Sequence, residues 1–156
     1  MDREKTVKRV VHALLRQQQL GVLSTSADDV PYASLVAFAA SVDDRHIYFA
    51  TPRATRKFAN MTANARVALL VNNSINHPAD FHQAKAVTAV GNARPIPEAR
   101  LEAVRSRYLE KHPYLESFAN APSCVFLKMR VDRYILVERF QNVSEYRIEH
   151  AMDPTP

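Results

Sequence analysis

The stretch that decides the fold is residues 47–71, IYFATPRATRKFANMTANARVALLV. It contains an apolar strand that ends at Thr51, a turn, a short helix that begins at Arg56 and Lys57, and a second apolar strand. The hydroxyls of Thr51 and Thr55 and two cations therefore gather where a helix begins, and the free N–H groups of its first turn add further donors. These groups suit a phosphate, so the segment predicts a site for a phosphorylated ligand.

The pair Arg56 and Lys57 also has a simpler interpretation, because charges on a helix face are usually only solvated. What favours ligand binding is the position of the pair, after a strand and a turn that carries hydroxyls and before a second strand. Asn60 follows Arg56 by four residues on the same helix face. We expect Asn60 to cap or pack the helix rather than to bind the ligand.

The chain of 156 residues, 47% of them hydrophobic, is long enough for one domain with a sizeable core and too short for two. We therefore expect a single domain over residues 1–156. The net charge of +5 is spread along the chain without a long run of like charges, so it permits acidic ligands without requiring nucleic acid. Aromatic and basic residues do not interleave as in RNA-binding strands, and we expect no nucleic-acid partner.

The sequence also indicates a compartment. Cys124 is the only cysteine and cannot form an internal disulfide, and the N-terminal stretch MDREKTVKRV lacks the apolar core of a signal peptide. The longest apolar-rich run, residues 33–42, is far shorter than the roughly 20 residues that cross a bilayer. We therefore expect a cytoplasmic protein that does not enter a membrane.

The pattern of apolar residues predicts the secondary structure. Apolar residues from Val7 to Leu15 recur at helical spacing and predict a helix over residues 4–18, within an N-terminal segment 1–19. The apolar runs that follow are separated by polar turn residues, as in an antiparallel meander. We expect strands at residues 21–26, 32–42, 46–51, 66–73 and 84–93, with two or three more between 124 and 148. Further helices are expected near residues 54–61 and over 97–112, and residues 141–156 form a C-terminal tail.

About seven short strands and three helices, without regular strand–helix alternation, favour an antiparallel barrel of the α+β class over a doubly wound sheet. Gly21 and Gly91 are the only glycines. This excludes the dinucleotide-binding fingerprint and the P-loop, because each needs several glycines in a short loop. A bound phosphate must then be held by side chains and a helix start. Gly91 lies within a predicted strand and indicates a bulge or a close approach of two backbones.

The order of these segments resembles a known family. A helix is followed by GVLST, VPYASLVAF, IYFAT, RKFANMTANARVALLV and AVTAVGNA, then by a second helix and paired strands. From about Leu14 to Val137 this order is similar to that of the flavin-binding split barrels related to pyridoxamine-phosphate oxidase. The resemblance implies a split β-barrel of six or seven strands, mainly antiparallel, with flanking helices.

The resemblance also implies which residues bind a cofactor. In that family the phosphate of flavin mononucleotide (FMN) is held by an Arg-Lys pair, here Arg56 and Lys57, with hydroxyls from the adjoining turn, here Thr51 and Thr55. The isoalloxazine ring lies along the second strand and near the residue that precedes the turn. The corresponding residues here are Ala33, Ser34, Leu35, Val36 and Ala50. The family's active form is a homodimer with the cofactor between the subunits, so the resemblance implies a homodimer.

The sequence departs from that family in two places. The tail RFQNVSEYRIEHAMDPTP lacks the segment with arginine and histidine that binds substrate in true pyridoxamine-phosphate oxidases, and Ala86 stands where those enzymes place a flavin-contacting glutamine. Related subgroups bind a deazaflavin or haem, and His150 is available as a haem ligand, although no neighbouring residue singles it out. We interpret the chain as an FMN-dependent oxidoreductase for a small molecule. The alternative is a noncatalytic flavin-binding or sensing module, and no catalytic residue is identifiable.

Other polar residues have plainer interpretations. Ser34 fits a hydrogen bond to a flavin edge and a bond to a backbone carbonyl equally well. His77 and His82 share a loop without a cysteine, so we expect solvated side chains and no metal site. Cys124 has no evident base partner and fits a structural thiol. Tyr108 is expected to pack its helix, as is Tyr114, although both lie where they could line a pocket.

Overall fold

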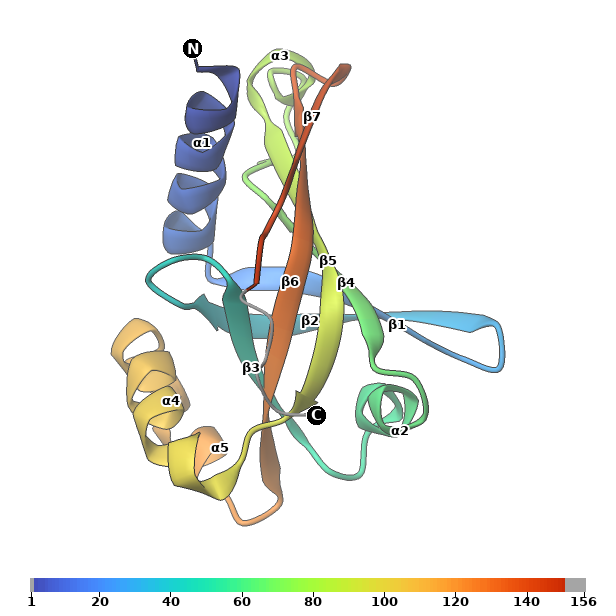
Figure 1. The fold of residues 1–156 in the computed structure, drawn as a ribbon, viewed down its shortest axis with the longest axis vertical. Helices are drawn as coiled ribbons and strands as arrows, with labels where there is room; N and C mark the ends of the chain where they lie inside the picture. The colour runs from blue at the N-terminus through green and yellow to red at the C-terminus, as the bar shows by residue number, and fades with distance from the viewer. Residues whose placement is uncertain (1, 151–156) are drawn as a thin grey trace.

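The computed structural model describes residues 2–150. Seven strands form one antiparallel sheet in the order β3-β2-β1-β4-β5-β6-β7, and a further pairing of β3 with β6 closes six of them into a barrel (Figure 1). This confirms the predicted α+β split barrel. The strands are β1 (Leu20–Ala27), β2 (Val30–Ala40), β3 (His46–Pro52), β4 (Arg66–Asn72), β5 (Lys85–Pro95), β6 (Cys124–Glu138) and β7 (Asn142–Arg147).

Residues 2–150 hold five α-helices and one 3-10 segment, where the sequence predicted three helices. These are α1 (Arg3–Gln17), α2 (Arg56–Ala63), α3 (Asp80–Gln83), α4 (Glu98–Lys111), η1 (Pro113–Leu115) and α5 (Glu116–Asn120). The prediction missed α3, η1 and α5 because each is too short to show an apolar period. None of the helices in this part of the chain has the length and apolar character to span a membrane.

The apolar stripe of α1 packs on the barrel, beside β6 and β7 (Figure 1). Val11, Leu14 and Leu15 are almost completely buried there. An ion cluster fixes the same helix to the β2–β3 turn, because the Asp44 carboxylate lies 2.6 Å from His12 Nδ1 and 3.0 Å from Arg16 Nη1. Burial of the stripe and this cluster together set the position of α1.

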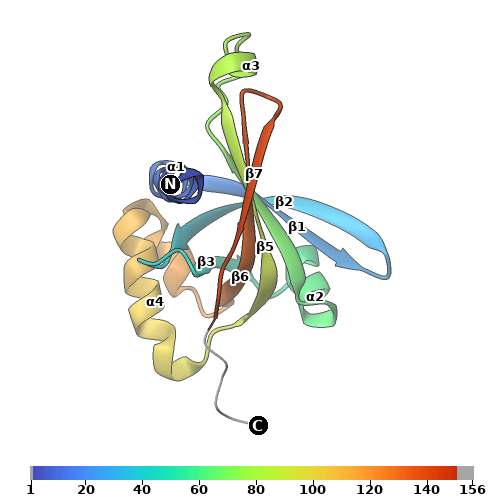
Figure 2. The same cartoon turned by 45° about the horizontal axis from the view of Figure 1, so that its top comes forward.

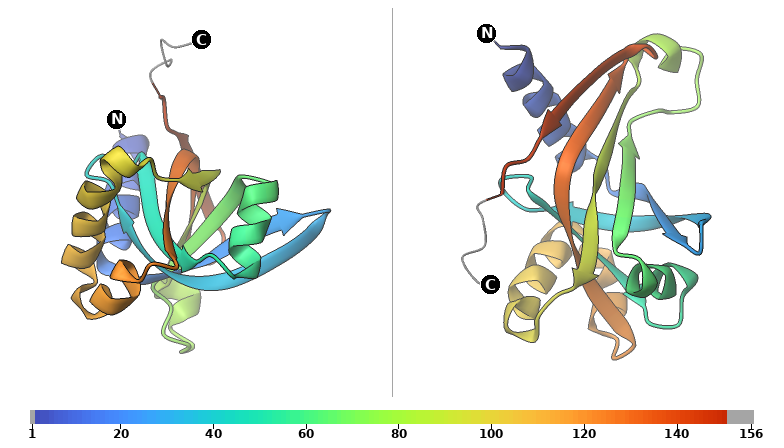
Figure 3. Two further views of the ribbon diagram at one scale, coloured as in Figure 1. Left: turned by 90° about the horizontal axis from the view of Figure 1, so that it is seen from below. Right: turned by 45° about the vertical axis from the view of Figure 1, so that its right-hand side comes forward.

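A second apolar cluster lies outside the barrel, where α4 and α5 cover strands β2, β3 and β6. Tyr108 of α4 is buried there, with its ring 5.2 Å from that of Phe126 in an edge-to-face contact. Helix α2 lies on the other side of the barrel, as Figure 3 shows. The β1–β2 hairpin projects beyond the barrel on the side of α2, away from α4, as Figure 2 shows.

The predicted irregularity at Gly91 is confirmed. The β5–β6 register shifts between Val90 and Gly91, where the two backbones approach closely. A Cβ atom on Gly91 would lie 1.9 Å from the carbonyl oxygen of Arg130. Only glycine fits this position of the strand without moving the backbone.

Candidate cofactor site

The turn between β3 and α2 is built on two threonines. Thr55 is the N-cap of α2, and its Oγ1 accepts a hydrogen bond of 3.3 Å from the backbone N–H of Phe58. Thr51 Oγ1 lies 2.9 Å from Thr55 Oγ1, and the Thr51 side chain is fully buried. Thr51 therefore faces the protein and holds Thr55, while Thr55 is half-buried at the surface of the turn.

The two cations predicted to bind phosphate follow this cap directly. Arg56 is exposed and Lys57 is half-buried. Neither side chain forms an ion pair or a hydrogen bond with another residue in the range 2–150. Their charges are therefore available, and they stand at the N-terminal end of α2, where the helix dipole also favours an anion.

Lys57 reaches a cavity of about 290 Å³ between the barrel and the outer helices. Four residues predicted from the sequence line this cavity: Leu35, Val36, Ala50 and Lys57. The structure thus brings together the middle of β2, the end of β3 and the first turn of α2. The cavity has one cation at its rim and mostly apolar walls, an arrangement suited to a ligand with a flat ring and an anionic end.

Ser34 and Ala33 occupy the outer half of β2 near this cavity without lining it. Ala33 is exposed. The Ser34 hydroxyl is buried, and among the described residues it has no hydrogen-bond partner. A buried hydroxyl without a partner is uncommon in proteins and costs about 1–3 kcal/mol, so this atom is a candidate for contact with a bound molecule.

With this geometry established, comparison with known proteins assigns the family. The model of the pyridoxamine 5'-phosphate oxidase family matches residues 7–138, most of the chain. The chain belongs to this family. A search of curated proteins gave no match.

Solved structures with the same fold include a putative oxidase, an FAD-binding protein and a haem-binding protein. A putative pyridoxamine 5'-phosphate oxidase from Listeria innocua has a TM-score of 0.66 at 19% identity, over 84% of this chain and 98% of that one. An FAD-binding protein from Mesorhizobium loti has a TM-score of 0.63 at 23% identity, over 80% and 89%. A haem-binding protein from Mycobacterium smegmatis has a TM-score of 0.75 at 16% identity, over 86% of this chain but only 56% of that one. These likenesses show the fold.

Within this oxidase-family barrel, the rest of the cavity lining comes from residues that the sequence did not predict for the site. They are Ala37, Pro52, Tyr108, Leu115 and Phe118. Three of them belong to α4, η1 and α5, which cover the outer face of the sheet. From the sequence we expected Tyr108 to pack its helix and kept the lining of a pocket as the alternative; in the structure Tyr108 is buried and also lines this cavity.

Two other residues considered in the sequence have structural roles in this family member, and a third does not pack as expected. Asn60 is buried, and its Nδ2 donates a hydrogen bond of 3.0 Å to Thr25 Oγ1, so Asn60 ties α2 to β1 as the packing interpretation expected. Burial raises the pKa of the Cys124 thiol, which agrees with a structural thiol. Tyr114 is almost fully exposed and does not pack its helix, so this expectation was wrong.

The loop that carries His77 and His82 is held by hydrogen bonds between its own residues. The Asp80 carboxylate accepts hydrogen bonds from the backbone N–H groups of Ile75 and His77, and His77 Nδ1 accepts one from the N–H of Ala79. Among the described residues no group of three or more histidine, cysteine or acidic side chains has the geometry of a metal site. These polar groups shape the turn before α3.

Proposed function

We propose that this protein is a cytoplasmic FMN-binding oxidoreductase that acts on a small molecule as a homodimer. The observation that carries the proposal is the cavity in which Lys57, at the start of α2, meets the middle of β2. A bound flavin would supply the hydride or electron transfer itself. The protein would bind the cofactor, orient its ring and restrict access to it.

The phosphate of the cofactor would lie at the start of α2. Lys57 and Arg56 offer two unpaired charges there, and the Thr55 hydroxyl lies at the same helix end. Charge-assisted hydrogen bonds contribute roughly 1.5–3 kcal/mol each, so two of them would give the phosphate a large share of a micromolar affinity. Thr51 would act through Thr55, because its side chain is fully buried.

The ring would lie along β2, against the apolar wall formed with Tyr108 and Phe118. The buried hydroxyl of Ser34 lacks a partner within residues 2–150 and would gain one from the edge of the ring or from a shift of β2 on binding. Ala33 would contact the ring through its backbone. These assignments keep the sequence-derived set, except that Thr51 would act indirectly, and add the aromatic wall.

Exposed apolar residues on the outer face of the sheet favour a homodimer. Leu35, Val22 and Leu70 are neighbours on the adjacent strands β2, β1 and β4, and Leu35 and Leu70 are exposed together with Leu20. This apolar face borders a second cavity of about 390 Å³, and Leu35 lines both this cavity and the candidate cofactor cavity. A second copy packed on this face would therefore also cover the edge of the cofactor.

The size of the candidate cofactor cavity also favours a homodimer. At about 290 Å³ it lies at the lower end of ligand pockets, which typically enclose roughly 300–1,000 Å³. One subunit would cover only part of a flavin, and the remainder of the ring would face the partner. The family's dimeric arrangement would complete the site.

Haem and deazaflavin remain the alternative cofactors. Haem is favoured by the similarity in fold to the haem-binding protein from Mycobacterium smegmatis. The cavity does not fit haem as well, because no histidine lines it. His150 Nε2 lies 2.7 Å from the carbonyl oxygen of Val131 and is engaged there. A noncatalytic flavin-binding module remains the alternative to an enzyme, since Lys57 is the only charged side chain that lines the cavity within residues 2–150.

The deciding experiment is the absorption spectrum of freshly purified protein, followed by mass analysis of the compound that heat releases. We expect a flavin spectrum and the mass of FMN. A Soret band, a deazaflavin mass, or a colourless protein that does not take up added FMN would overturn the assignment. If the protein is yellow but is neither reduced by nicotinamide nucleotides nor turned over with any acceptor, the noncatalytic alternative holds.

A further inference from the structure

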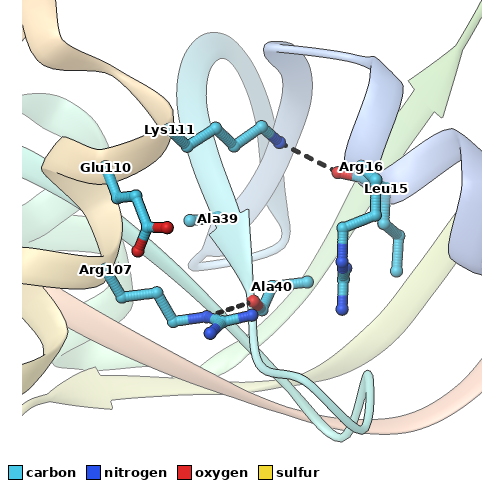
Figure 4. Close-up of a pocket in the computed structure, with 7 residues that line it drawn as sticks. All are labelled: Leu15, Arg16, Ala39, Ala40, Arg107, Glu110 and Lys111. Atoms are coloured by element: carbon cyan, nitrogen blue, oxygen red, sulfur yellow. Dashed lines mark hydrogen bonds between the residues drawn. The ribbon is translucent and has the colours of Figure 1, made fainter.

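A third cavity lies between the C-terminal turn of α1, the end of β2 and the C-terminal half of α4, and encloses about 260 Å³ (Figure 4). Its lining residues are Leu15, Arg16, Ala39, Ala40, Arg107, Glu110 and Lys111. It shares none of them with the candidate cofactor cavity. Any ligand bound here would therefore occupy a separate site.

The cavity carries an excess of positive charge. Arg16 is already paired with Asp44 at 3.0 Å, so the charges left for a ligand are those of Arg107 and Lys111. Glu110 is the only acidic side chain in the lining, and it makes no ion pair with either cation. Partly buried cations without a carboxylate partner are costly for a protein to keep.

Both cations are held in place by backbone carbonyls, as Figure 4 shows. Lys111 Nζ donates to the Leu15 carbonyl oxygen at 2.9 Å and lies 3.9 Å from the centre of the Phe38 ring. Arg107 Nε donates to the Ala40 carbonyl oxygen at 2.7 Å. Two ammonium protons and the outer guanidinium nitrogens of Arg107 have no acceptor among the described residues.

The remaining donors suit an oxyanion. A guanidinium fixed through Nε presents its outer N–H groups as a planar fork, which matches a carboxylate or a phosphate. The ammonium group of Lys111 adds a point charge nearby. Burial, with a smaller contribution from the neighbouring Arg16, lowers the pKa of Lys111 to about 8. An anion in the cavity would reverse the direction of this shift.

We propose that the cavity between α1 and α4 binds a small oxyanion, a carboxylate or phosphate group, through Arg107 and Lys111. The site is independent of the proposed cofactor site.

The test is NMR of the protein with ¹³C-labelled lysine, purified with whatever cofactor it carries and kept in a buffer without oxyanions. Malonate and inorganic phosphate are titrated separately. We expect the Lys111 Cε signal to shift with saturation, and its apparent pKa to rise from about 8 in the presence of the bound anion. Tighter binding of malonate would identify a carboxylate as the natural group, and tighter binding of inorganic phosphate would identify a phosphate.

Substitutions of the lining residues test where the anion binds. Arg107→Gln should weaken anion binding, read from the Lys111 signal, by about tenfold or more, and Lys111→Met should weaken it by a similar factor in isothermal titration calorimetry. Arg100→Gln, which changes an exposed arginine on the same helix that does not line the cavity, should leave binding unchanged. The double variant Arg56→Ala/Lys57→Ala should also leave malonate binding unchanged, which separates this site from the cofactor site.

Three results would overturn the proposal. The first is a Lys111 signal that does not respond to either anion below about 50 mM, a range well above ordinary cellular affinities. The second is equal binding by Arg107→Gln and Arg100→Gln when circular dichroism shows that both are folded. The third is a shift that disappears in the Arg56→Ala/Lys57→Ala variant, which would place the bound anion at the start of α2.

Discussion

Thr51 Oγ1 and Thr55 Oγ1 lie 2.9 Å apart, and this contact joins the end of β3 to the first turn of α2. Thr55 uses the same oxygen to cap the helix through the N–H of Phe58. The end of a barrel strand therefore fixes the position of a helix N-terminus. The cations that follow, Arg56 and Lys57, are placed by this arrangement.

The capping of α2 by Thr55 leads to a first prediction, on stability and on FMN binding. Thr55→Ala removes the acceptor for the Phe58 N–H and should lower the free energy of unfolding by about 1 kcal/mol, measured by urea denaturation. FMN affinity should fall as well, because the start of α2 loses its anchor. Thr55→Ser keeps the hydroxyl and is the control. Equal losses in the alanine and serine variants would show that the methyl group matters and the cap does not.

The phosphate contacts lead to a second prediction. Arg56→Ala/Lys57→Ala should weaken FMN binding by about 100-fold or more, since two charge-assisted bonds of roughly 1.5–3 kcal/mol are lost. Riboflavin, which has no phosphate, should bind both proteins equally in flavin-fluorescence titrations. Lys5→Ala/Arg9→Ala on the exposed side of α1 changes the net charge by the same amount and controls for general electrostatics. A parallel loss of riboflavin affinity would mean that the pair supports the fold of the site and does not bind the phosphate.

The apolar face of β2, β1 and β4 gives a third prediction. Leu35→Asp should convert a dimer to a monomer in light scattering after gel filtration, because it places a charge on an apolar interface. FMN should also bind more weakly, since Leu35 lines both cavities. Val42→Asp changes an equally exposed valine outside this face and should remain dimeric. A Leu35→Asp protein that stays dimeric with normal affinity would place the interface elsewhere.

Much of the fold could be predicted because its signals are local. Turn residues mark the ends of the strands, and the stripe of α1 gives the correct helix within one residue at each end. The start of α2 was predictable for the same reason, since the cap and the cations are adjacent in sequence. Helices α3 and α5 were missed because an element of four or five residues has no apolar period.

The rest of the candidate site depends on contacts between segments far apart in the chain. Tyr108 is 51 residues after Lys57 in the sequence, yet both line one cavity, because β6 pairs with β3 and brings the covering helices back over the sheet. The charge cluster of Arg107 and Lys111 likewise needs α1 beside α4. Single-sequence patterns carry no information about such pairings, so only the half of the cavity formed by β2, β3 and α2 was predicted.

Lys111 gives a prediction on pH dependence. Its pKa is about 8 in the folded protein against 10.5 for a free side chain, and the charged or titratable groups around it are Arg16, Arg107, Glu110 and His112. Between these pH values the unfolded chain binds more protons, so this residue makes the free energy of unfolding rise as the pH increases from 8 to 10.5. The free energy of unfolding of the wild type and of Lys111→Met is measured by urea denaturation without oxyanions. The difference between the two separates the contribution of Lys111 from the contributions of the tyrosines and the cysteine. We expect the difference to change over this range and to be constant below pH 7. A flat difference throughout would show that the ammonium group is well solvated.

The bulge at Gly91 gives the last prediction. In Gly91→Ala the new Cβ would meet the Arg130 carbonyl oxygen at 1.9 Å, so the backbone of β5 or β6 must move. We expect a loss of roughly 3 kcal/mol, seen as a fall of about 6–12 °C in Tm for a chain of this length. Gly21→Ala is the matched control, because its Cβ meets the end of the Leu69 side chain at 2.9 Å and a backbone atom, the Leu70 carbonyl oxygen, only at 3.2 Å, so we expect a smaller loss. If the two variants lose the same stability, β5 and β6 are more compliant at the bulge than the tight backbone contact implies.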